Sequence, residues 1–171
     1  SERVDTLVEK GEDLTSAILL SKLQQLLNNK REISLGFMPQ DYQETLQLAL
    51  SPVEFLNQTG HKEELQKIQS FLASLNFSYP EMHQQIHSLS GGQQGKLLLL
   101  NLVLRKPNFL LLDEPTRNFS PTSQPEIRKL FANYSGGLVT VSHDRRFLKE
   151  VCTSIYSLTE HGLKVVDLQD L

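Results

Sequence analysis

The sequence has little that would cross-link it or anchor it in a membrane. Its single cysteine, Cys152, excludes an internal disulfide; it is typical of a reducing compartment, and filling the core is an equal alternative. The richest apolar stretch, residues 97–104, is interrupted by Asn101 and is far shorter than the roughly 20 residues of a spanning helix. No charged and then apolar leader with a small-residue cleavage site opens the chain. These absences favour a soluble, cytoplasmic protein.

The composition has no excess of charge of either sign. A net charge of −3 gives no electrostatic case for binding nucleic acid. The 39% hydrophobic and 22% charged content are those of an ordinary globular protein. With 171 residues, the chain has room for one domain whose core is large enough to fold without disulfides.

Apolar spacing predicts that the first part of the chain is mostly helical. Leucine and isoleucine recur at helical spacing over residues 13–29, and residues 33–38 form a short strand that Pro39 closes. The pattern from there to about residue 88 is helical, and Ser90 opens a further helix that runs to about Arg105.

The second part of the chain alternates strands with helices. The predicted strands are 109–113, 137–142, 154–158 and 163–166, and the predicted helices are 123–134 and one that begins at Asp144. The uncharged run Phe109–Leu112 is typical of a strand buried on both faces of a parallel sheet. The pattern therefore predicts an α/β fold with an all-helical insertion.

Asp113 and Glu114 follow this buried strand at its carboxyl end, the usual position of a ligand crevice in open α/β folds. A carboxylate there can hold Mg²⁺, mostly through water. The second carboxylate can polarise a water for in-line attack on a γ-phosphate. The plain alternative is a strand that merely ends in an acidic turn.

The segment Ser90-Gly91-Gly92-Gln93 reads as a capping box, with serine at the N-cap and glutamine three residues later. Two glycines also expose backbone N–H groups at a helix N-terminus, where the helix dipole favours an anion. The segment therefore suits a terminal phosphate as well as a helix start.

Two further polar residues follow strands. His143 comes after the apolar strand 137–142, where it can hydrogen-bond a γ-phosphate and sense hydrolysis. Gln40 comes after Pro39 and can serve as a neutral ligand to a metal or a water. At either position a satisfied polar side chain without a ligand is the alternative. The remaining histidines show no metal-ligand spacing; they are His61, His83, His87 and His161.

In this order the motifs resemble the ATP-binding cassette (ABC) ATPases. Residues 36–40 resemble the Q-loop, 89–93 the ABC signature, 109–114 the Walker B strand with its catalytic glutamate, and 142–148 the switch-histidine segment. The last of these, with Leu-Arg-Lys-Pro at 104–107, is similar to the F subfamily, which comprises soluble twin-cassette proteins without membrane domains, many of them acting on the ribosome.

The resemblance implies an α/β fold whose parallel-sheet, three-layer core carries an all-helical signature subdomain. It divides the chain into an unassigned helical segment, 1–32, and a partial nucleotide-binding domain, 33–171, in which residues 41–105 form the helical subdomain. The implied cofactors are ATP and Mg²⁺, and the implied partners are a second cassette and the ribosome.

The resemblance also assigns roles to residues. Glu114 and His143 would be catalytic, and Asp113 and Gln40 would hold the metal in the cassette's own site. Gln40 would also contact the nucleotide bound by its own cassette. The nucleotide bound by the partner cassette would instead contact the signature residues Ser90, Gly91, Gly92 and Gln93.

The chain departs from the family pattern in three respects. It has no Gly-x-x-x-x-Gly-Lys-Ser/Thr phosphate loop, nor the strand and antiparallel sheet that precede that loop. Ser120 stands where the segment after Walker B usually ends in aspartate, which puts communication between paired sites in question. Residues 1–30 match no identified part of the cassette. The resemblance therefore implies that the chain alone is inactive and that an intact parent protein hydrolyses ATP.

Other interpretations of the same motifs compete with the F-type one. A transporter's nucleotide-binding subunit would carry a groove for a membrane helix in its helical insertion. A loop-less, catalytically dead cassette would serve as an interaction module, although the retained Glu114 and His143 count against it. The C-terminal half of a chromosome-maintenance ATPase is excluded, because Gln40 is present and no sustained heptad is.

Overall fold

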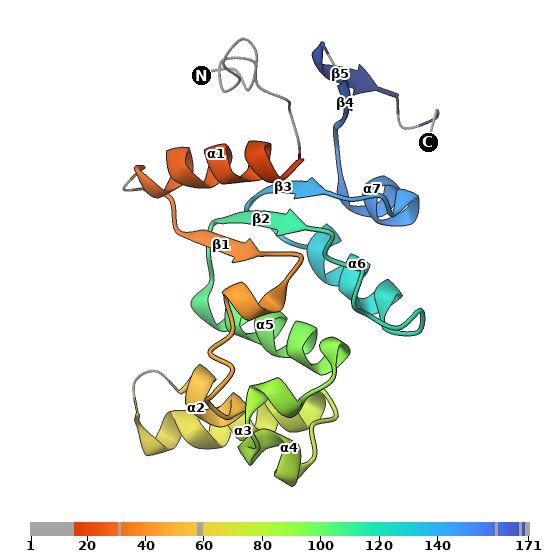
Figure 1. Cartoon of the computed structure of the whole chain (residues 1–171). Coiled ribbons are helices and arrows are strands. Elements are labelled where there is room, and N and C mark those ends of the chain that lie inside the picture. Colours follow the sequence, from red (N-terminus) through yellow and green to blue (C-terminus); the bar gives the residue numbers. More distant parts are fainter. Residues whose placement is uncertain (1–15, 31, 58–59, 160, 168, 170–171) are drawn as a thin grey trace.

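The computed structural model describes residues 16–30, 32–57, 60–159, 161–167 and 169 (Figure 1). Its helices are α1 (Ser16–Asn28), α2 (Pro52–Leu56), α3 (Lys62–Ser74), α4 (Tyr79–His83), α5 (Gly91–Arg105), α6 (Gln124–Ala132) and α7 (Arg145–Val151). Two short 3-10 helices are η2 (Tyr42–Glu44) and η3 (Ile86–Ser88). The strands are β1 (Leu35–Met38), β2 (Phe109–Asp113), β3 (Gly137–Val141), β4 (Ile155–Thr159) and β5 (Gly162–Val166).

The centre of the fold is a parallel sheet of three strands in the order β1-β2-β3. The middle strand, β2, is the most deeply buried because it has a neighbour on each side, and its residues Leu110–Leu112 are all buried. Helix α1 lies over one face, and α5 and α6 lie on the other (Figure 1). Helices on both faces of a parallel sheet confirm the predicted α/β class, whose strands are connected by helical crossovers.

Gly36 allows helix α5 to pack closely on β1. A Cβ atom at Gly36 would lie 2.7 Å from Cδ2 of Leu110, 2.8 Å from Cγ of Pro107 and 2.9 Å from Cδ2 of Leu102. Such distances are far below van der Waals contact, so any larger residue would force the surrounding side chains to shift and loosen the packing of α5 on the sheet.

All elements between Tyr42 and Arg105 are helical, as the apolar spacing predicted. Ser51 begins α2 with a capping box: its hydroxyl accepts from the Glu54 N–H over 3.3 Å, and the Glu54 carboxylate accepts from the Ser51 N–H over 2.8 Å. One hydrophobic cluster runs from these helices through α5 to the sheet, so the helical part and the sheet share a core.

Strands β4 and β5 form a separate antiparallel hairpin. Gly162 takes a φ of +107° at the start of β5, a conformation that residues with a Cβ rarely adopt. The predicted helix over 13–29 is present as α1, although its predicted residues 13–15 lie outside the described part of the chain. Among the described residues, no helix combines the length and the apolar character needed to cross a bilayer.

Candidate nucleotide site

The parallel sheet brings the predicted polar residues to one edge. Met38 pairs with Leu112, and Asp113 pairs with Val141, so all three strands end at the same level. Gln40 follows β1, Asp113 ends β2, and His143 follows β3 by two residues. Because parallel strands share their carboxyl edge, this is the position where open α/β sheets bind ligands.

Glu114 is held in place by the loop that follows β3. Its backbone N–H donates to the Val141 carbonyl over 2.9 Å, and its Oε1 accepts from the His143 N–H over 3.0 Å. Its Oε2 lies 3.5 Å from the Ser142 hydroxyl. The Glu114 side chain is 14% exposed, so water reaches the carboxylate only from a restricted side.

The His143 imidazole extends into solvent beside this carboxylate. Its Nε2 lies 3.7 Å from Glu114 Oε1, and its side chain is 98% exposed. The ring is therefore available to a bound ligand, whereas the backbone N–H of the same residue fixes Glu114. His143 and Glu114 thus form a unit in which one residue is fixed and the other is accessible.

Asp113 and Gln40 are the predicted metal ligands. The described residues contain no group of three or more histidine, cysteine, aspartate and glutamate side chains able to hold a metal ion together. This arrangement still fits Mg²⁺, because that ion keeps several waters and needs only one or two carboxylates in addition to substrate phosphates. Asp113 is half-buried at the strand end, and Gln40 is exposed beyond the adjacent strand.

The signature segment begins helix α5 as the sequence predicts. The Ser90 hydroxyl accepts from the Gln93 N–H over 3.3 Å, and Gln93 Oε1 accepts from the Ser90 N–H over 3.0 Å. Gln93 Nε2 also donates to Oε1 of Glu81 over 2.6 Å. The amide of Gln93 is therefore engaged within the chain, which makes Gln93 a residue that holds the helix start in place.

The two glycines leave the start of α5 uncovered. A Cβ at Gly91 would meet no atom within 4 Å, and one at Gly92 would meet only the Asn118 carbonyl, at 3.4 Å. The first N–H groups of a helix lack partners within the helix, and they attract anions. The open space over Gly91 leaves room for such a ligand.

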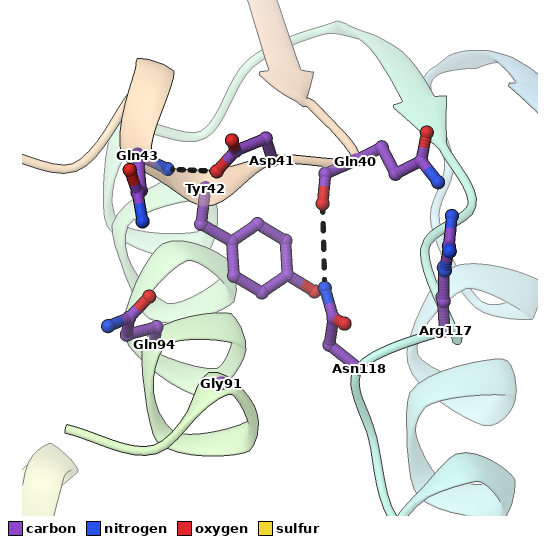
Figure 2. Close-up of a pocket in the computed structure, with 8 residues that line it drawn as sticks. All are labelled: Gln40, Asp41, Tyr42, Gln43, Gly91, Gln94, Arg117 and Asn118. Atoms are coloured by element: carbon purple, nitrogen blue, oxygen red, sulfur yellow. Dashed lines mark hydrogen bonds between the residues drawn. The ribbon is translucent and has the colours of Figure 1, made fainter.

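A pocket of about 400 Å³ lies between this helix start and the segment after β1 (Figure 2). Its lining residues are Gln40, Asp41, Tyr42, Gln43, Gly91, Gln94, Arg117 and Asn118. The pocket brings together two of the predicted site residues, Gln40 and Gly91, from parts of the sequence about 50 residues apart. Asn118 closes one side, where its Nδ2 donates to the Gln40 carbonyl over 3.5 Å.

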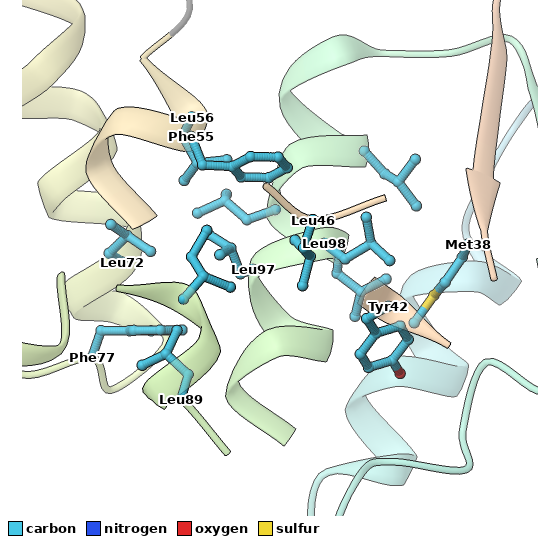
Figure 3. Close-up of a cluster of buried hydrophobic side chains, with 14 of the residues drawn as sticks. Met38, Tyr42, Leu46, Phe55, Leu56, Leu72, Phe77, Leu89, Leu97 and Leu98 are labelled. Carbon is cyan, nitrogen blue, oxygen red and sulfur yellow. The ribbon is translucent and has the colours of Figure 1, made fainter. Parts of the chain in front are cut away.

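Sequence reasoning assigned no role to Tyr42, which lines this pocket. The ring belongs to the core cluster with Met38, Leu46 and Leu98 (Figure 3). Its hydroxyl is buried next to the Asn118 side chain. Burial raises the pKa of Tyr42, against a smaller opposite effect of the nearby Asn118 side chain. The tyrosine therefore stays a protonated donor at neutral pH.

Ser120, which departs from the family pattern, lies in the turn before α6. Its hydroxyl is 2.9 Å from the Thr122 hydroxyl and 3.0 Å from the Ser123 hydroxyl. Its carbonyl accepts from the Ser123 N–H over 2.9 Å. Ser120 therefore has a local role in starting the helix.

Comparison with curated proteins shows similarity to long ATP-binding proteins. A probable ATP-binding protein YheS of Haemophilus influenzae is 29% identical over 150 residues, which cover 88% of this chain and 23% of that protein. The ATP-binding cassette sub-family F member 3 of Pongo abelii is 29% identical over 150 residues, covering 86% of this chain and 21% of that protein. The chain thus spans between a fifth and a quarter of these relatives.

A solved structure shows the same fold. The dimeric, post-hydrolysis state of the ATP-binding cassette MJ0796 bound to ADP and Pi superposes with a TM-score of 0.66 at 20% identity, covering 91% of this chain and 68% of that one.

The sequence profile described as ABC transporter matches residues 6–117. The match includes residues 6–32, which the sequence alone left unassigned. Its last part contains the segments that resemble the signature and the Walker B strand, including the two carboxylates Asp113 and Glu114. Since this profile covers more than half of the chain, the chain belongs to the ABC transporter family of ATP-binding cassettes.

Proposed function

We propose that this chain is part of an F-type ATPase that binds MgATP between two cassettes and hydrolyses it. The observation that carries the proposal is the pairing of Glu114 with His143 at the carboxyl edge of the sheet, where the Glu114 carboxylate is oriented by the His143 N–H over 3.0 Å. The family is one of ATP hydrolases that bind ATP with Mg²⁺, and an oriented carboxylate at this edge is what water attack requires.

Each residue has a separate task in the proposed reaction. The Glu114 carboxylate accepts a proton from the attacking water. The exposed His143 ring contacts the γ-phosphate and responds to its loss. Asp113, with Gln40, would hold Mg²⁺, which would neutralise charge on the phosphates.

The start of α5 serves the second site. Ser90 and the N–H groups of Gly91 and Gly92 face the nucleotide held by a partner cassette, and Gln93 keeps them in position from within the helix. The proposed cycle brings the cassettes together on MgATP and separates them after hydrolysis. By the same F-type resemblance, the cassette works in the cytoplasm, and the ribosome is one candidate target beside antibiotic protection and transport.

The relatives support the F-type assignment over the transporter subunit. YheS and the sub-family F member 3 each align with most of this chain. The hydrogen bonds at Glu114 favour a hydrolase over an inert module, because an inert module has no use for an oriented carboxylate. The missing phosphate loop leaves the chain inactive alone in this proposal.

The test replaces Glu114 by glutamine in the complete twin-cassette protein. Glu114→Gln keeps an oxygen that can accept the His143 N–H but removes the base, so we expect retained MgATP binding, loss of steady-state turnover and a stable pair of cassettes. Glu126→Gln, on the exposed face of α6, is the matched control with wild-type turnover. Hydrolysis by Glu114→Gln within a few-fold of wild type would refute the role of Glu114.

A further inference from the structure

Thr116 is a buried polar residue two positions beyond Glu114. It is 3% exposed, and its hydroxyl donates to Oδ2 of Asp144 over 3.0 Å. We propose that Thr116 is a positioning residue. Its hydrogen bond holds the loop after β2 to the loop after β3 and so keeps Glu114 in position next to His143. The inference deepens the proposed ATP hydrolysis and rests on it.

The loop after β2 needs such a stabilising hydrogen bond because Glu114 has an unfavourable backbone conformation. Its φ of +48° lies in the left-handed region, which residues with a Cβ adopt only when their surroundings enforce it. Pro115, next in the chain, is fully buried and has no N–H to donate. Thr116 is therefore the first residue after Glu114 that both is buried and hydrogen-bonds to the opposite loop through its side chain.

Asp144 gives Thr116 a rigid point of attachment. Its Oδ1 accepts from the N–H groups of Arg146 and Phe147 over 3.0 and 3.1 Å and so caps helix α7. Phe147 is fully buried, which fixes that helix in the core. The second carboxylate oxygen of Asp144, Oδ2, accepts the hydrogen bond from the Thr116 hydroxyl.

Asp144 also lies next to the groups that orient Glu114. Asp144 directly follows His143, whose N–H donates to Glu114. The Asp144 N–H donates to the Ser142 hydroxyl over 3.1 Å, and this hydroxyl lies 3.5 Å from the other oxygen of Glu114. A shift of Thr116 relative to Asp144 therefore changes the distance between Glu114 and its donors.

The first measurement uses the 171-residue chain and needs no ATP hydrolysis. Hydrogen exchange of the His143 amide is followed by NMR in wild type, Thr116→Val and Thr116→Ser. The valine keeps the shape but lacks the hydroxyl, so we expect about tenfold faster exchange at His143, as for loss of one hydrogen bond to a charged group. The serine keeps the hydroxyl and should exchange as wild type does.

The amides within α5 serve as the internal reference. If Thr116→Val speeds exchange at His143 and in α5 equally, Thr116 only supports the fold and the proposal is wrong. Unchanged exchange at His143 also overturns it.

The second measurement is turnover in the complete twin-cassette protein. Thr116→Val should lower kcat about tenfold without changing KM for ATP, because the Thr116 hydrogen bond positions the Glu114 carboxylate and does not contribute to nucleotide binding. Thr116→Ser should restore kcat. Wild-type kcat in the valine variant, or a change confined to KM, would contradict the positioning role. Failure of the hydrolase proposal itself would show separately, as undiminished turnover in Glu114→Gln.

Discussion

The His143 N–H donates to the Glu114 carboxylate over 3.0 Å, although 29 residues separate the two in the chain. Adjacent parallel strands make this contact possible, because Asp113 and Val141 pair in register and each strand ends within a residue of that pair. The register of β2 against β3 is therefore what aligns the candidate base with the loop that orients it.

Ser90→Arg should block hydrolysis at the nucleotide of the partner cassette without unfolding this domain. Ser90 is exposed at the start of α5, so the arginine would fill the space over Gly91 rather than enter the core. The measurements are ATP turnover of the twin-cassette protein and thermal unfolding.

Ser90→Ala is the matched control for Ser90→Arg, since it loses the same cap, worth about 1 kcal/mol, without adding bulk. If Ser90→Arg melts far below wild type, capping alone explains Ser90. Unchanged turnover would remove Ser90 from the site.

The 171-residue chain alone should bind MgATP only in the millimolar range or more weakly. In the proposed site, the Walker B and signature segments would reach only Mg²⁺ and one edge of the γ-phosphate, whereas most phosphate contacts in such sites come from a loop that this sequence lacks. Each lost charge-assisted contact costs about 1.5–3 kcal/mol, and each 1.4 kcal/mol is about tenfold in affinity. Calorimetric titration tests this, and a micromolar dissociation constant would reveal an unrecognised phosphate site.

Glu81 should make the helical part sensitive to acid. The Ser78 N–H, the Ser78 hydroxyl and the Gln93 amide all donate to its carboxylate, and they lower the pKa of Glu81 below its ordinary value of 4.5. A lowered pKa in the folded state means that this stabilisation is present above about pH 4.5 and is lost as the pH falls through the folded-state pKa.

Replacing the Glu81 carboxylate should therefore make stability depend less on pH in the acid range. In Glu81→Gln the side chain no longer titrates, so Tm should fall less steeply than in wild type as the pH is lowered from about 5 to 3. Glu126→Gln removes an exposed carboxylate elsewhere and controls for net charge. Equal slopes for Glu81→Gln and wild type would show that the three hydrogen bonds do not act on folding.

Local patterns allowed much of the fold to be predicted. The capping box at Ser90 involves residues three apart, so its sequence signature is complete within the motif, and α5 begins where that signature places it. Strand β2 was predictable because burial on both faces requires an uncharged run. The order of the strands required the structure, since residues 35 and 109 pair without any local signal.

The candidate site was predictable only as separate motifs. Gln40 and Gly91 were identified singly, but their common pocket depends on how α5 packs on β1. The bond between Thr116 and Asp144 joins residues 28 apart, and a threonine after a proline carries no sign of it. Only the location of Thr116 in the sequence could have drawn attention to it. Thr116 and Asn118 both lie in the segment that follows Walker B, and the end of this segment departs from the family pattern.

At Glu114, the left-handed backbone conformation lowers stability at the residue whose carboxylate is proposed to be the base. A residue with a Cβ in this conformation costs about 1–2 kcal/mol, an appreciable part of the roughly 5–15 kcal/mol that holds a domain folded. Glycine would remove that cost but has no carboxylate. In the proposed hydrolase, replacing Glu114 by glycine would therefore stabilise the fold and at the same time remove the base.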